Sequence, residues 1–282
     1  MTLDHTMRGR RMPIVFTDLD GSLMNHTDYS IEGARRALGV LHSAGIPLVV
    51  CTSKTRAELE RLLGQISPDS PFVAENGGGV FFPPACSDWI IPDARSLGNL
   101  RCISLGAPYA AIRSFMERVG ERFGARGFAD MDVEEISHLT GLGLDDAALA
   151  RMREFTEPFV LEREECLPLL EREAAASGLA ITKGGRFYHC MGRGADKGAA
   201  VRLVMDIVER NLGTDLVSIA AGDSHNDLSM LASVDIPVLI PHEDGSLEDV
   251  DLPGLVKADH PGSRGFNDAV MRILETLGLH QG

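Results

Sequence analysis

Residues 16–22 read Phe16-Thr17-Asp18-Leu19-Asp20-Gly21-Ser22, and the chain enters them from the apolar run Pro13-Ile14-Val15-Phe16. An apolar run of this length that leads into a turn-forming glycine predicts a buried strand. Side chains two positions apart on a strand share a side, so Asp18 and Asp20 are expected to crowd one volume. A hard cation such as Mg²⁺ would relieve their repulsion. The alternative is an ordinary Asp-Gly turn that closes the strand.

Composition and charge limit the classes of protein to which the chain can belong. The 282 residues are 44% hydrophobic and 24% charged, which is normal for a globular chain of two ordinary domains or one large one. The formal net charge of −14 argues against a nucleic-acid partner or an anionic membrane surface, because both require basic patches. An anionic small molecule is still compatible, since a metal ion and a few cations can invert the field locally.

Three further signals concern the cellular compartment. The five cysteines form no Cys-x-x-Cys pair and are odd in number, which favours free thiols in a reducing cytoplasm. No apolar run approaches the roughly 18 residues that a membrane-spanning helix needs. Residues 1–12 are polar and basic without the apolar stretch of a signal peptide, so we expect a frayed tail and a cytoplasmic protein.

Beyond the first turn, strand and helix patterns alternate. The predicted elements are a helix from Ser30 to Gly45, a strand at 46–51, a helix from a Thr55–Glu58 capping box to Leu63, and a strand at 71–75 before Asn76 and three glycines. Strand–helix–strand order predicts a parallel sheet, the core of an α/β fold. All three predicted strands end in polar, hydroxyl-bearing or glycine-rich residues.

Near Pro83-Pro84 the pattern becomes shorter and more charged, and we expect residues 84–191 to form an inserted α+β domain. Its predicted elements are a strand at 101–105, helices at 110–123, 145–155 and 164–177, and a hairpin at 180–189 with a Gly184-Gly185 loop. Residues 1–83 and 192–282 then form the core domain. The two connections, Pro83-Pro84 and residues 192–194, are expected to act as hinges.

The alternating pattern resumes after the insertion. The expected elements are a helix at 197–210 capped by Asp196, a strand at 216–221, a short helix at 228–233, strands at 236–240 and 255–257, and a helix at 267–277. The strand at 216–221 ends in Gly-Asp-Ser-His-Asn-Asp at 222–227. In one parallel sheet, Asp223 and Asp227 would join Asp18 and Asp20 at the carboxyl edge and form a metal site.

Phosphate chemistry requires further groups: a nucleophile, an acid/base, and cations or N–H donors for the phosphoryl oxygens. A carboxylate such as that of Asp18 can accept a phosphoryl group. Thr52 and Lys54 follow the second strand, and Lys197 opens a helix whose N-terminal amides also donate. For either lysine alone, a solvated surface position is the alternative.

These residues together resemble the four motifs of the haloacid dehalogenase superfamily of phosphatases. The motifs match in order at Asp18–Ser22, Thr52, Lys197 and residues 222–227, with Ser22 where the family usually has threonine. The insertion at 84–191 is similar to the large cap domain of that superfamily. The resemblance implies a Rossmann-like parallel-sheet core with an inserted α+β cap that determines substrate specificity.

Four further stretches resemble the mannosyl-3-phosphoglycerate phosphatase family. They are residues 52–55 (Thr-Ser-Lys-Thr), 75–78 (Glu-Asn-Gly-Gly), 153–159 (Arg-Glu-Phe-Thr-Glu-Pro-Phe) and 184–189 (Gly-Gly-Arg-Phe-Tyr-His). Many relatives carry Gly-Arg where Ser53-Lys54 stand. The last two stretches fall in the cap, where sugar and carboxylate recognition is expected.

The resemblance implies a role for each matched residue. Asp18 would be the nucleophile that forms an aspartyl phosphate, and Asp20 the general acid/base. Mg²⁺ would be bound by Asp18, the Asp20 backbone carbonyl and Asp223, with support from Asp227. The phosphoryl oxygens would be held by Thr52 and Lys197, with Ser53, Lys54 and Asn226 nearby.

Three cap residues are candidates for contacts with the rest of the substrate. Arg186 can bind a carboxylate through two parallel hydrogen bonds, although an arginine in a hairpin turn can equally lie in solvent. Glu157 can accept hydrogen bonds from sugar hydroxyls, and His189 is the third candidate. The sequence does not decide the oligomeric state.

The leading hypothesis is a Mg²⁺-dependent phosphatase that converts mannosyl-3-phosphoglycerate, a small phosphorylated sugar–glycerate substrate, to the compatible solute mannosylglycerate. One alternative keeps the chemistry but uses another sugar phosphate, such as glucosyl-3-phosphoglycerate or sucrose phosphate, or moves phosphate as a mutase. A different class is a glycosyltransferase that uses the Asp-x-Asp pair to bind a nucleotide sugar, which would leave residues 222–227 and Lys197 without a role.

Overall fold

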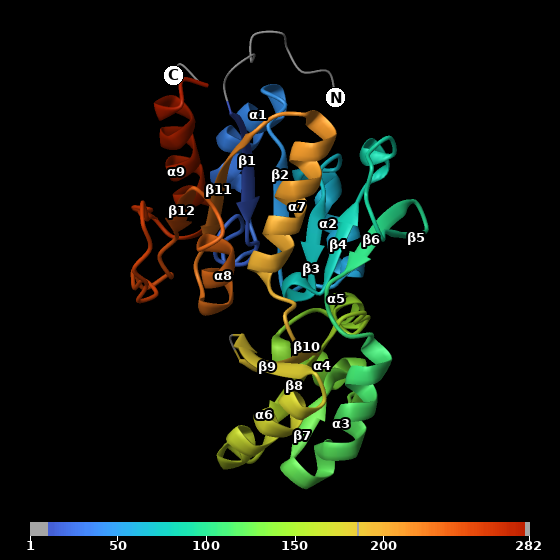
Figure 1. Ribbon diagram of the computed structural model, residues 1–282. Coiled ribbons are helices and arrows are strands. Elements are labelled where there is room, and N and C mark those ends of the chain that lie inside the picture. The colour runs from blue at the N-terminus through green and yellow to red at the C-terminus, as the bar shows by residue number, and fades with distance from the viewer. Residues whose placement is uncertain (1–10, 185, 280–282) are drawn as a thin grey trace.

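The computed structural model describes residues 11–184 and 186–279 and contains two β-sheets. The larger sheet has nine strands in the order β13-β12-β11-β1-β2-β3-β4-β6-β5, and the smaller has four in the order β7-β8-β10-β9. Figure 1 shows the larger sheet with its helices above and the smaller unit below. Most of the N-terminal tail expected at residues 1–12 lies outside the described residues.

β1 (Met12–Thr17) is the central strand and confirms the strand predicted before Asp18. All six of its residues are buried, and it pairs in parallel with β11 (Leu216–Gly222) and β2 (Leu48–Cys51). The parallel part of the sheet is completed by β3 (Phe72–Ala74), β12 (Ile236–Leu239) and β13 (Val256–Lys257). The carboxyl ends of β1, β2 and β11 therefore meet at one edge, as in other open α/β sheets.

Helices cover both faces of this sheet because its strands alternate apolar side chains between them. Val15 packs in one apolar cluster, with α1 (Arg35–Ser43), α2 (Arg56–Ile66) and α9 (Gly262–Thr276). Phe16 packs in the opposite cluster, with α7 (Lys197–Leu212) and α8 (Leu228–Leu231). The capping box predicted at the start of α2 is present.

The larger sheet corrects the domain boundary predicted at residues 83–84. β4 (Gly79–Phe82) pairs antiparallel with β6 (Leu100–Ser104), which pairs with β5 (Arg95–Leu97). Residues 84–104 therefore extend the core, and the proposed hinge at Pro83-Pro84 lies inside it. The changed sequence pattern marks a switch from parallel to antiparallel pairing, which allows one face of a strand to be solvated, and no new domain starts here.

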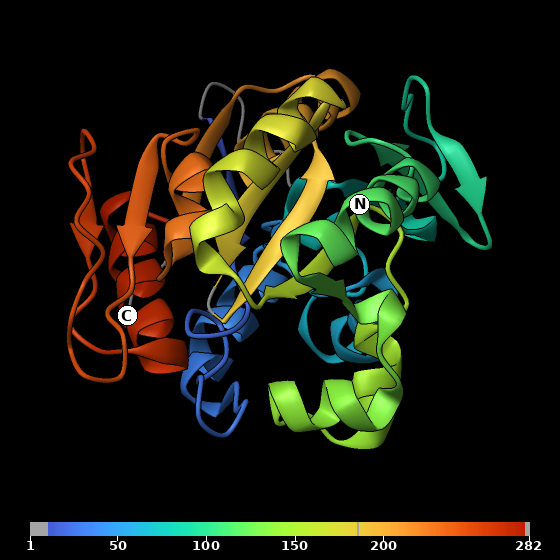
Figure 2. The ribbon, with the colours of Figure 1, turned by 90° about the horizontal axis from the view of Figure 1, so that it is seen from below.

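The second unit, called the cap below, begins with α3 (Tyr109–Phe123) and ends with β10 (Phe187–Gly192). Its sheet also contains β7 (Ala125–Gly127), β8 (Thr156–Leu161) and β9 (Leu179–Gly184). One face of this sheet packs against α3 and α6 (Leu167–Ala176). Figure 2, seen from the cap side, shows α6 lying over the outer face of the strands.

Several cap elements differ from the prediction. A helix, α4 (Val133–Thr140), was not predicted, although Asp132 and Glu135 form a capping box at its start. α5 (Leu144–Ala150) follows Gly143 and stops six residues before the first residue of β8, not at Phe155. The hairpin is confirmed, but Phe187 pairs with Gly184, so its loop is residues 185–186, of which 185 lies outside the described residues.

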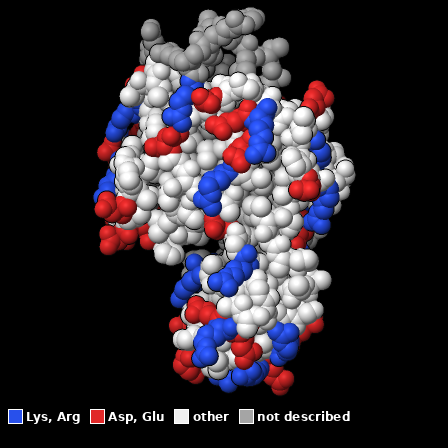
Figure 3. All heavy atoms as spheres, viewed as in Figure 1, with Lys and Arg blue, Asp and Glu red and all other residues white. Residues whose placement is uncertain are grey.

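The surface carries mixed charges. Figure 3 shows acidic and basic side chains interspersed over one face of core and cap, without a single basic patch on that face. Within the described part of the chain, no helix combines the length and the apolarity needed to cross a membrane.

Candidate active site

A buried lysine joins two of the carboxylates at the edge of the core sheet. Asp18 follows β1 directly, and Lys197 is the first residue of α7. The Lys197 Nζ lies 2.7 Å from Asp18 Oδ1 and 2.6 Å from Asp227 Oδ1. Burial disfavours the ammonium, but the two carboxylates outweigh it and raise the pKa of Lys197 well above its usual value. Lys197 is therefore a fixed positive charge beside Asp18.

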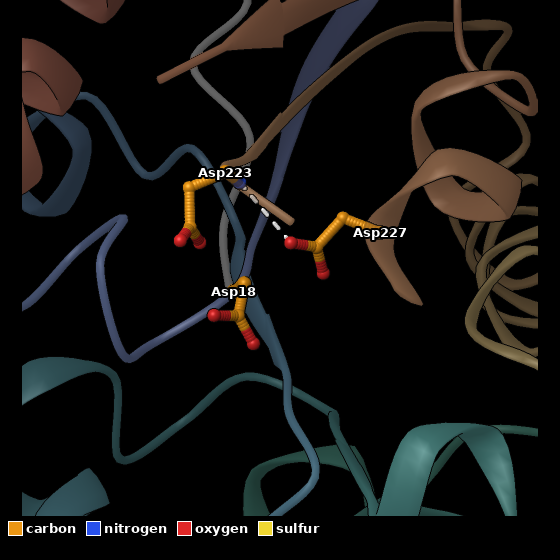
Figure 4. Close-up of side chains that lie close together, drawn as sticks. All are labelled: Asp18, Asp223 and Asp227. Carbon is orange, nitrogen blue, oxygen red and sulfur yellow. Dashed lines mark hydrogen bonds between the residues drawn. The ribbon is translucent and has the colours of Figure 1, made fainter. Parts of the chain in front are cut away.

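Three carboxylates converge at this point. Ligand oxygens of Asp18, Asp223 and Asp227 all lie within 4.8 Å of one another (Figure 4). Burial and the neighbouring carboxylates raise the pKa of Asp223 to about 7, and burial also raises that of Asp18 well above its usual value. One ammonium does not balance three buried carboxylates, so the site favours an additional cation. Oxygen-only donors of this kind suit Mg²⁺.

Local contacts fix the two aspartates of the 222–227 turn. Asp227 Oδ2 accepts hydrogen bonds from the backbone N–H groups of Asp223 and Ser224, both at 3.1 Å. The Ser22 hydroxyl donates to Asp223 Oδ1 at 3.0 Å, so serine serves at the position where the family usually has threonine. Gly21 has a φ of +88°, and a Cβ there would lie 2.4 Å from Asp223 Oδ2. Only glycine fits this turn without moving Asp223.

Asp20 lies outside the cluster of three carboxylates and pairs with a lysine instead. Its Oδ2 forms an ion pair with Lys54 Nζ at 2.7 Å, and its Oδ1 is buried without a hydrogen-bond partner among the described residues. Burial lowers the pKa of Lys54, but Asp20 and Glu58 outweigh it and raise the value above normal. Both aspartate side chains line the same cavity, as expected, but Asp20 is not a member of the three-carboxylate cluster, because the chain has left the strand at Asp18 and its two-residue alternation no longer applies.

The predicted phosphate-binding residues lie around these groups. Thr52 is buried at the end of β2, and its hydroxyl accepts the N–H of Lys54 at 3.3 Å. Ser53 and Asn226 line a cavity that also contains Asp18 and Asp20. These hydroxyl, amide and ammonium groups approach the carboxylates from the loops after β2 and β11.

The cavity has a volume of about 510 Å³ and is walled by both domains. From the cap, His189 of β10 contributes a side chain that is only 7% exposed, and its Nδ1 has no partner among the described residues. Burial and the charge of Arg153 lower the pKa of His189 to about 3, so the imidazole is neutral at ordinary pH. The core contributes His26 and the loop after β12, residues 241–244.

Comparison with known proteins identifies the family. Residues 15–97 match the haloacid dehalogenase-like hydrolases. The chain is 45% identical over 272 residues to the glucosyl-3-phosphoglycerate/mannosyl-3-phosphoglycerate phosphatase of Persephonella marina. This alignment covers 94% of this chain and 98% of that relative. It is 30% identical to the mannosyl-3-phosphoglycerate phosphatase of Pyrococcus furiosus, over 80% of this chain and 90% of the relative. The chain belongs to the mannosyl-3-phosphoglycerate phosphatase family.

Solved structures agree on the fold. The sucrose-phosphatase of Synechocystis sp. PCC6803, solved with sucrose and phosphate, superposes with a TM-score of 0.60 at 12% identity and covers 95% of this chain and 98% of that one. The subclass IIB sugar phosphatase BT4131 superposes with a TM-score of 0.62 at 16% identity, over 95% and 100% of the two chains. The predicted core-and-cap fold is thereby confirmed. Membership of a phosphatase family excludes the glycosyltransferase alternative.

Two of the three cap candidates lie away from the cavity of this phosphatase. Glu157 shares a sheet face with Phe159, which packs against α3 and α6, and its oxygens accept from Tyr109 and from the Ala129 N–H at 2.9 Å. Arg186 lies exposed in the hairpin turn and donates to the Thr140 carbonyl at 2.6 Å. Among the three candidates, only His189 lines the cavity.

Sequence reasoning missed two features of this phosphatase. His242 follows β12, with its Nδ1 3.8 Å from Asp223 Oδ2, and the rule that ligands bind beyond strand ends could have identified it. Arg153 and Glu75 lie 78 positions apart and form a buried ion pair at 3.3 Å. No sequence spacing indicates a contact of that kind.

Proposed function

We propose that this enzyme hydrolyses the phosphate monoester of a glycosyl-3-phosphoglycerate, with a mannosyl or a glucosyl group, and uses Mg²⁺. The observation that carries the proposal is the 45% identity to a relative named for both substrates, along nearly the whole of both chains. A second relative, from Methanococcoides burtonii, carries the same name at 42% identity. The cavity beside Asp18 has the size expected of a small-molecule site.

The reaction proceeds in two displacements on Asp18. Because Lys197 holds Oδ1, the other carboxylate oxygen attacks phosphorus, and the bond from phosphorus to the glycerate oxygen breaks. Asp20 donates a proton to the leaving alkoxide. A water molecule then attacks the aspartyl phosphate, Asp20 takes the proton of this water, and phosphate leaves as Asp18 is regenerated.

The structure supports separate roles for the two aspartates. Asp18 lies in the carboxylate cluster close to Lys197, whereas Asp20 lines the cavity outside that cluster, and its Oδ1 has no hydrogen-bond partner within residues 11–184 and 186–279. Asp20 is thus placed to reach a leaving oxygen without competing for the cation. Its partner Lys54 orients the carboxylate through the ion pair at 2.7 Å.

Mg²⁺ would be held by Asp18, Asp223 and, directly or through water, Asp227, together with the Asp20 carbonyl. The bound ion would neutralise charge on the phosphoryl oxygens. Thr52, Ser53, Asn226 and Lys197 supply the donors of this chain that hold those oxygens. Each carboxylate in this set also has a protein contact that fixes its orientation.

The glycerate and glycosyl groups would occupy the rest of the cavity, between His189 of the cap and the 241–244 loop of the core. A neutral imidazole can both donate and accept a hydrogen bond, which suits a sugar hydroxyl. We also propose that the cap limits access of water to the site, and that the enzyme works in the cytoplasm, where its five free thiols stay reduced.

The test is phosphate release from a small panel of esters, with and without Mg²⁺. The panel contains the mannosyl and glucosyl esters of 3-phosphoglycerate, unmodified 3-phosphoglycerate, mannose 6-phosphate and sucrose 6-phosphate, with the Asp18→Asn variant as blank. We expect Mg²⁺-dependent release from the two glycosyl-phosphoglycerates, absent in the blank. Preferred turnover of another ester would reject the substrate proposal but retain the chemistry, and activity in the blank would reject the nucleophile.

A further inference from the structure

One segment of the cap is built into the core. Residues 153–156, between α5 and β8, lie against Glu75, which follows β3 and is fully buried with a φ of +52°. The Glu75 carboxylate accepts the N–H groups of Glu154 at 2.8 Å, Phe155 at 3.1 Å and Thr156 at 2.8 Å, and the Thr156 hydroxyl at 2.8 Å. We call these contacts the cap anchor.

Apolar packing reinforces the cap anchor. Phe155 belongs to the main apolar cluster of the core and packs edge-on against Phe81, with ring centroids 6.0 Å apart. A Cβ at Gly78 would lie 2.3 Å from the Cβ of Phe155, so the core provides a glycine where this ring enters. The cap is therefore attached at a third place besides its two chain connections.

Arg153 extends from the cap anchor to the phosphate-binding loop. Its side chain is 4% exposed, and the guanidinium lies 3.3 Å from Glu75 Oε2 and donates to the Thr156 hydroxyl at 2.6 Å. The same Nη2 donates to the backbone carbonyl of Ser53 at 3.1 Å. Ser53 lines the catalytic cavity. One cap side chain thus contacts both the anchor and a loop that surrounds the phosphate.

The loop after β3 links the cap anchor to the turn at residues 222–227, which contains the proposed metal-binding aspartates. The N–H of Asn76, the residue after Glu75, donates to the Thr52 carbonyl at 2.9 Å. The Asn76 side-chain oxygen accepts a hydrogen bond from Asn226 at 3.1 Å. The loops after β2, β3 and β11 therefore meet where the cap anchor is attached.

We propose that Arg153 is a positioning residue that couples docking of the cap to the geometry of the phosphate-binding loop. Glu75 and the Thr156 hydroxyl hold the guanidinium in place, so its bond to Ser53 fixes the loop backbone at the orientation that presents Thr52 and Ser53 to the phosphoryl oxygens. Without a docked cap, the Ser53 carbonyl loses this donor and the loop gains freedom. This role rests on the proposed phosphatase function but not on the identity of the sugar.

The chain offers a matched control for the test. Arg61 of α2 also forms an ion pair between core and cap, with Asp146 at 2.8 Å, but the two side chains are 59% and 51% exposed and do not contact the loop at 52–54 among the described residues. Arg61→Ala therefore removes a cap contact of similar chemistry without removing the link to Ser53. Exposed pairs of this kind contribute little to stability.

The experiment compares Arg153→Lys, which keeps a charge beside Glu75 but cannot make the same three contacts, with Arg61→Ala and the unmodified enzyme. Isothermal titration with inorganic phosphate in the presence of Mg²⁺ measures the phosphate affinity, which depends on the geometry of the loop, and kcat and KM are measured with p-nitrophenyl phosphate. We expect Arg153→Lys to weaken phosphate binding and to lower kcat, each by roughly five- to twentyfold. Arg61→Ala should change neither by more than about twofold.

Unchanged phosphate affinity and kcat in Arg153→Lys, with only a lower melting temperature, would overturn the proposal, as would equal losses in Arg61→Ala. If Arg153→Lys does not fold, Thr156→Val decides, because it removes one support of the guanidinium. Phosphate binding weakened about threefold supports the coupling, and unchanged binding overturns it. Failure of the enzyme on glycosyl-phosphoglycerates would reject the proposed substrate but leave these phosphate measurements interpretable.

Discussion

Replacement of Glu75 by glutamine should loosen the cap from the core. The carboxylate accepts four hydrogen bonds from residues 154–156 and pairs with the buried Arg153. Glutamine has the same shape, but it presents one NH₂ group, and three of the bonds converge on Oε2. The amide oxygen therefore takes the Oε2 position, and the NH₂ group faces the N–H of Glu154 at 2.8 Å, where two donors oppose each other.

The expected loss of stability follows from these contacts. Removal of one charge from a buried ion pair costs about 3–5 kcal/mol, because the remaining charge is left without compensation. The lost hydrogen bond to Glu154 is part of the same change, so its contribution is not added. We expect a free energy of unfolding lower by about 3–4 kcal/mol. For a chain of this length, that corresponds to a melting temperature lower by about 10 °C.

Urea unfolding followed by circular dichroism measures this loss, and a double-mutant cycle isolates the pair. Arg153→Met removes the second charge, so Glu75→Gln combined with Arg153→Met should be less destabilised than the sum of the two single variants, by about 1–3 kcal/mol. Glu154→Gln, at a half-buried ion pair with Arg56, serves as the charge-matched control. A loss below about 1 kcal/mol in Glu75→Gln would refute the reasoning, because a carboxylate with these contacts would then contribute no more than an average hydrogen bond.

Three further predictions concern the site. Lys197→Met should lower kcat by about 100- to 1,000-fold, measured by phosphate release, because it removes the buried charge beside Asp18; a loss below tenfold would contradict this role. Mg²⁺ at 100 times its dissociation constant should stabilise the enzyme by about 2.7 kcal/mol, a gain reversed by chelation and reduced in Asp223→Asn, as read from melting temperatures. The pKa of His189 is about 3 in the folded enzyme, below its unfolded value, so the unfolded chain binds the extra proton and the contribution of His189 to stability falls as pH drops below about 6.5, by up to about 1.4 kcal/mol per pH unit. Because the raised pKa of Asp223 acts in the opposite direction, the test is the difference between variants in urea unfolding at pH 7 and pH 5: the change on acidification in the unmodified enzyme and in His225→Asn should be more destabilising than in His189→Asn, and equal changes would count against a buried neutral imidazole.

The sequence predicted the centre of the core because local pattern and tertiary position agree there. A buried parallel strand is apolar along its whole length, and its turn carries the chemistry, so Asp18, Thr52 and Asp223 could be assigned to strand ends before their spatial proximity was known. The same agreement located Lys197 at the first residue of a helix. Strand-end residues of a parallel sheet meet at one edge whatever the strand order.

The pattern failed where antiparallel strands extend the core. The expected boundary near residue 83 rested on shorter and more polar segments, but β6 buries only one of its faces and β5, at the sheet edge, is largely exposed, so both resemble a separate domain in sequence. Periodicity reports how many faces of a strand are buried. It does not report which sheet the strand joins.

The cap candidates show a second limit of sequence-based prediction: the sequence does not decide which side chains of a strand lie on which face of the sheet. On β8 and β10, Glu157 pairs with Cys190 and His189 pairs with Pro158. Cys190 lies in the cap's apolar cluster, so Glu157 beside it faces the helices, while His189, one position away, faces the core and lines the cavity. A one-residue shift of β10 would move His189 to the helix-covered face and away from the cavity. A resemblance in sequence identifies the strand that carries recognition, but only the strand pairing determines which of its side chains meets the substrate. Here that side chain is His189, whose imidazole is kept neutral by burial and by the charge of Arg153.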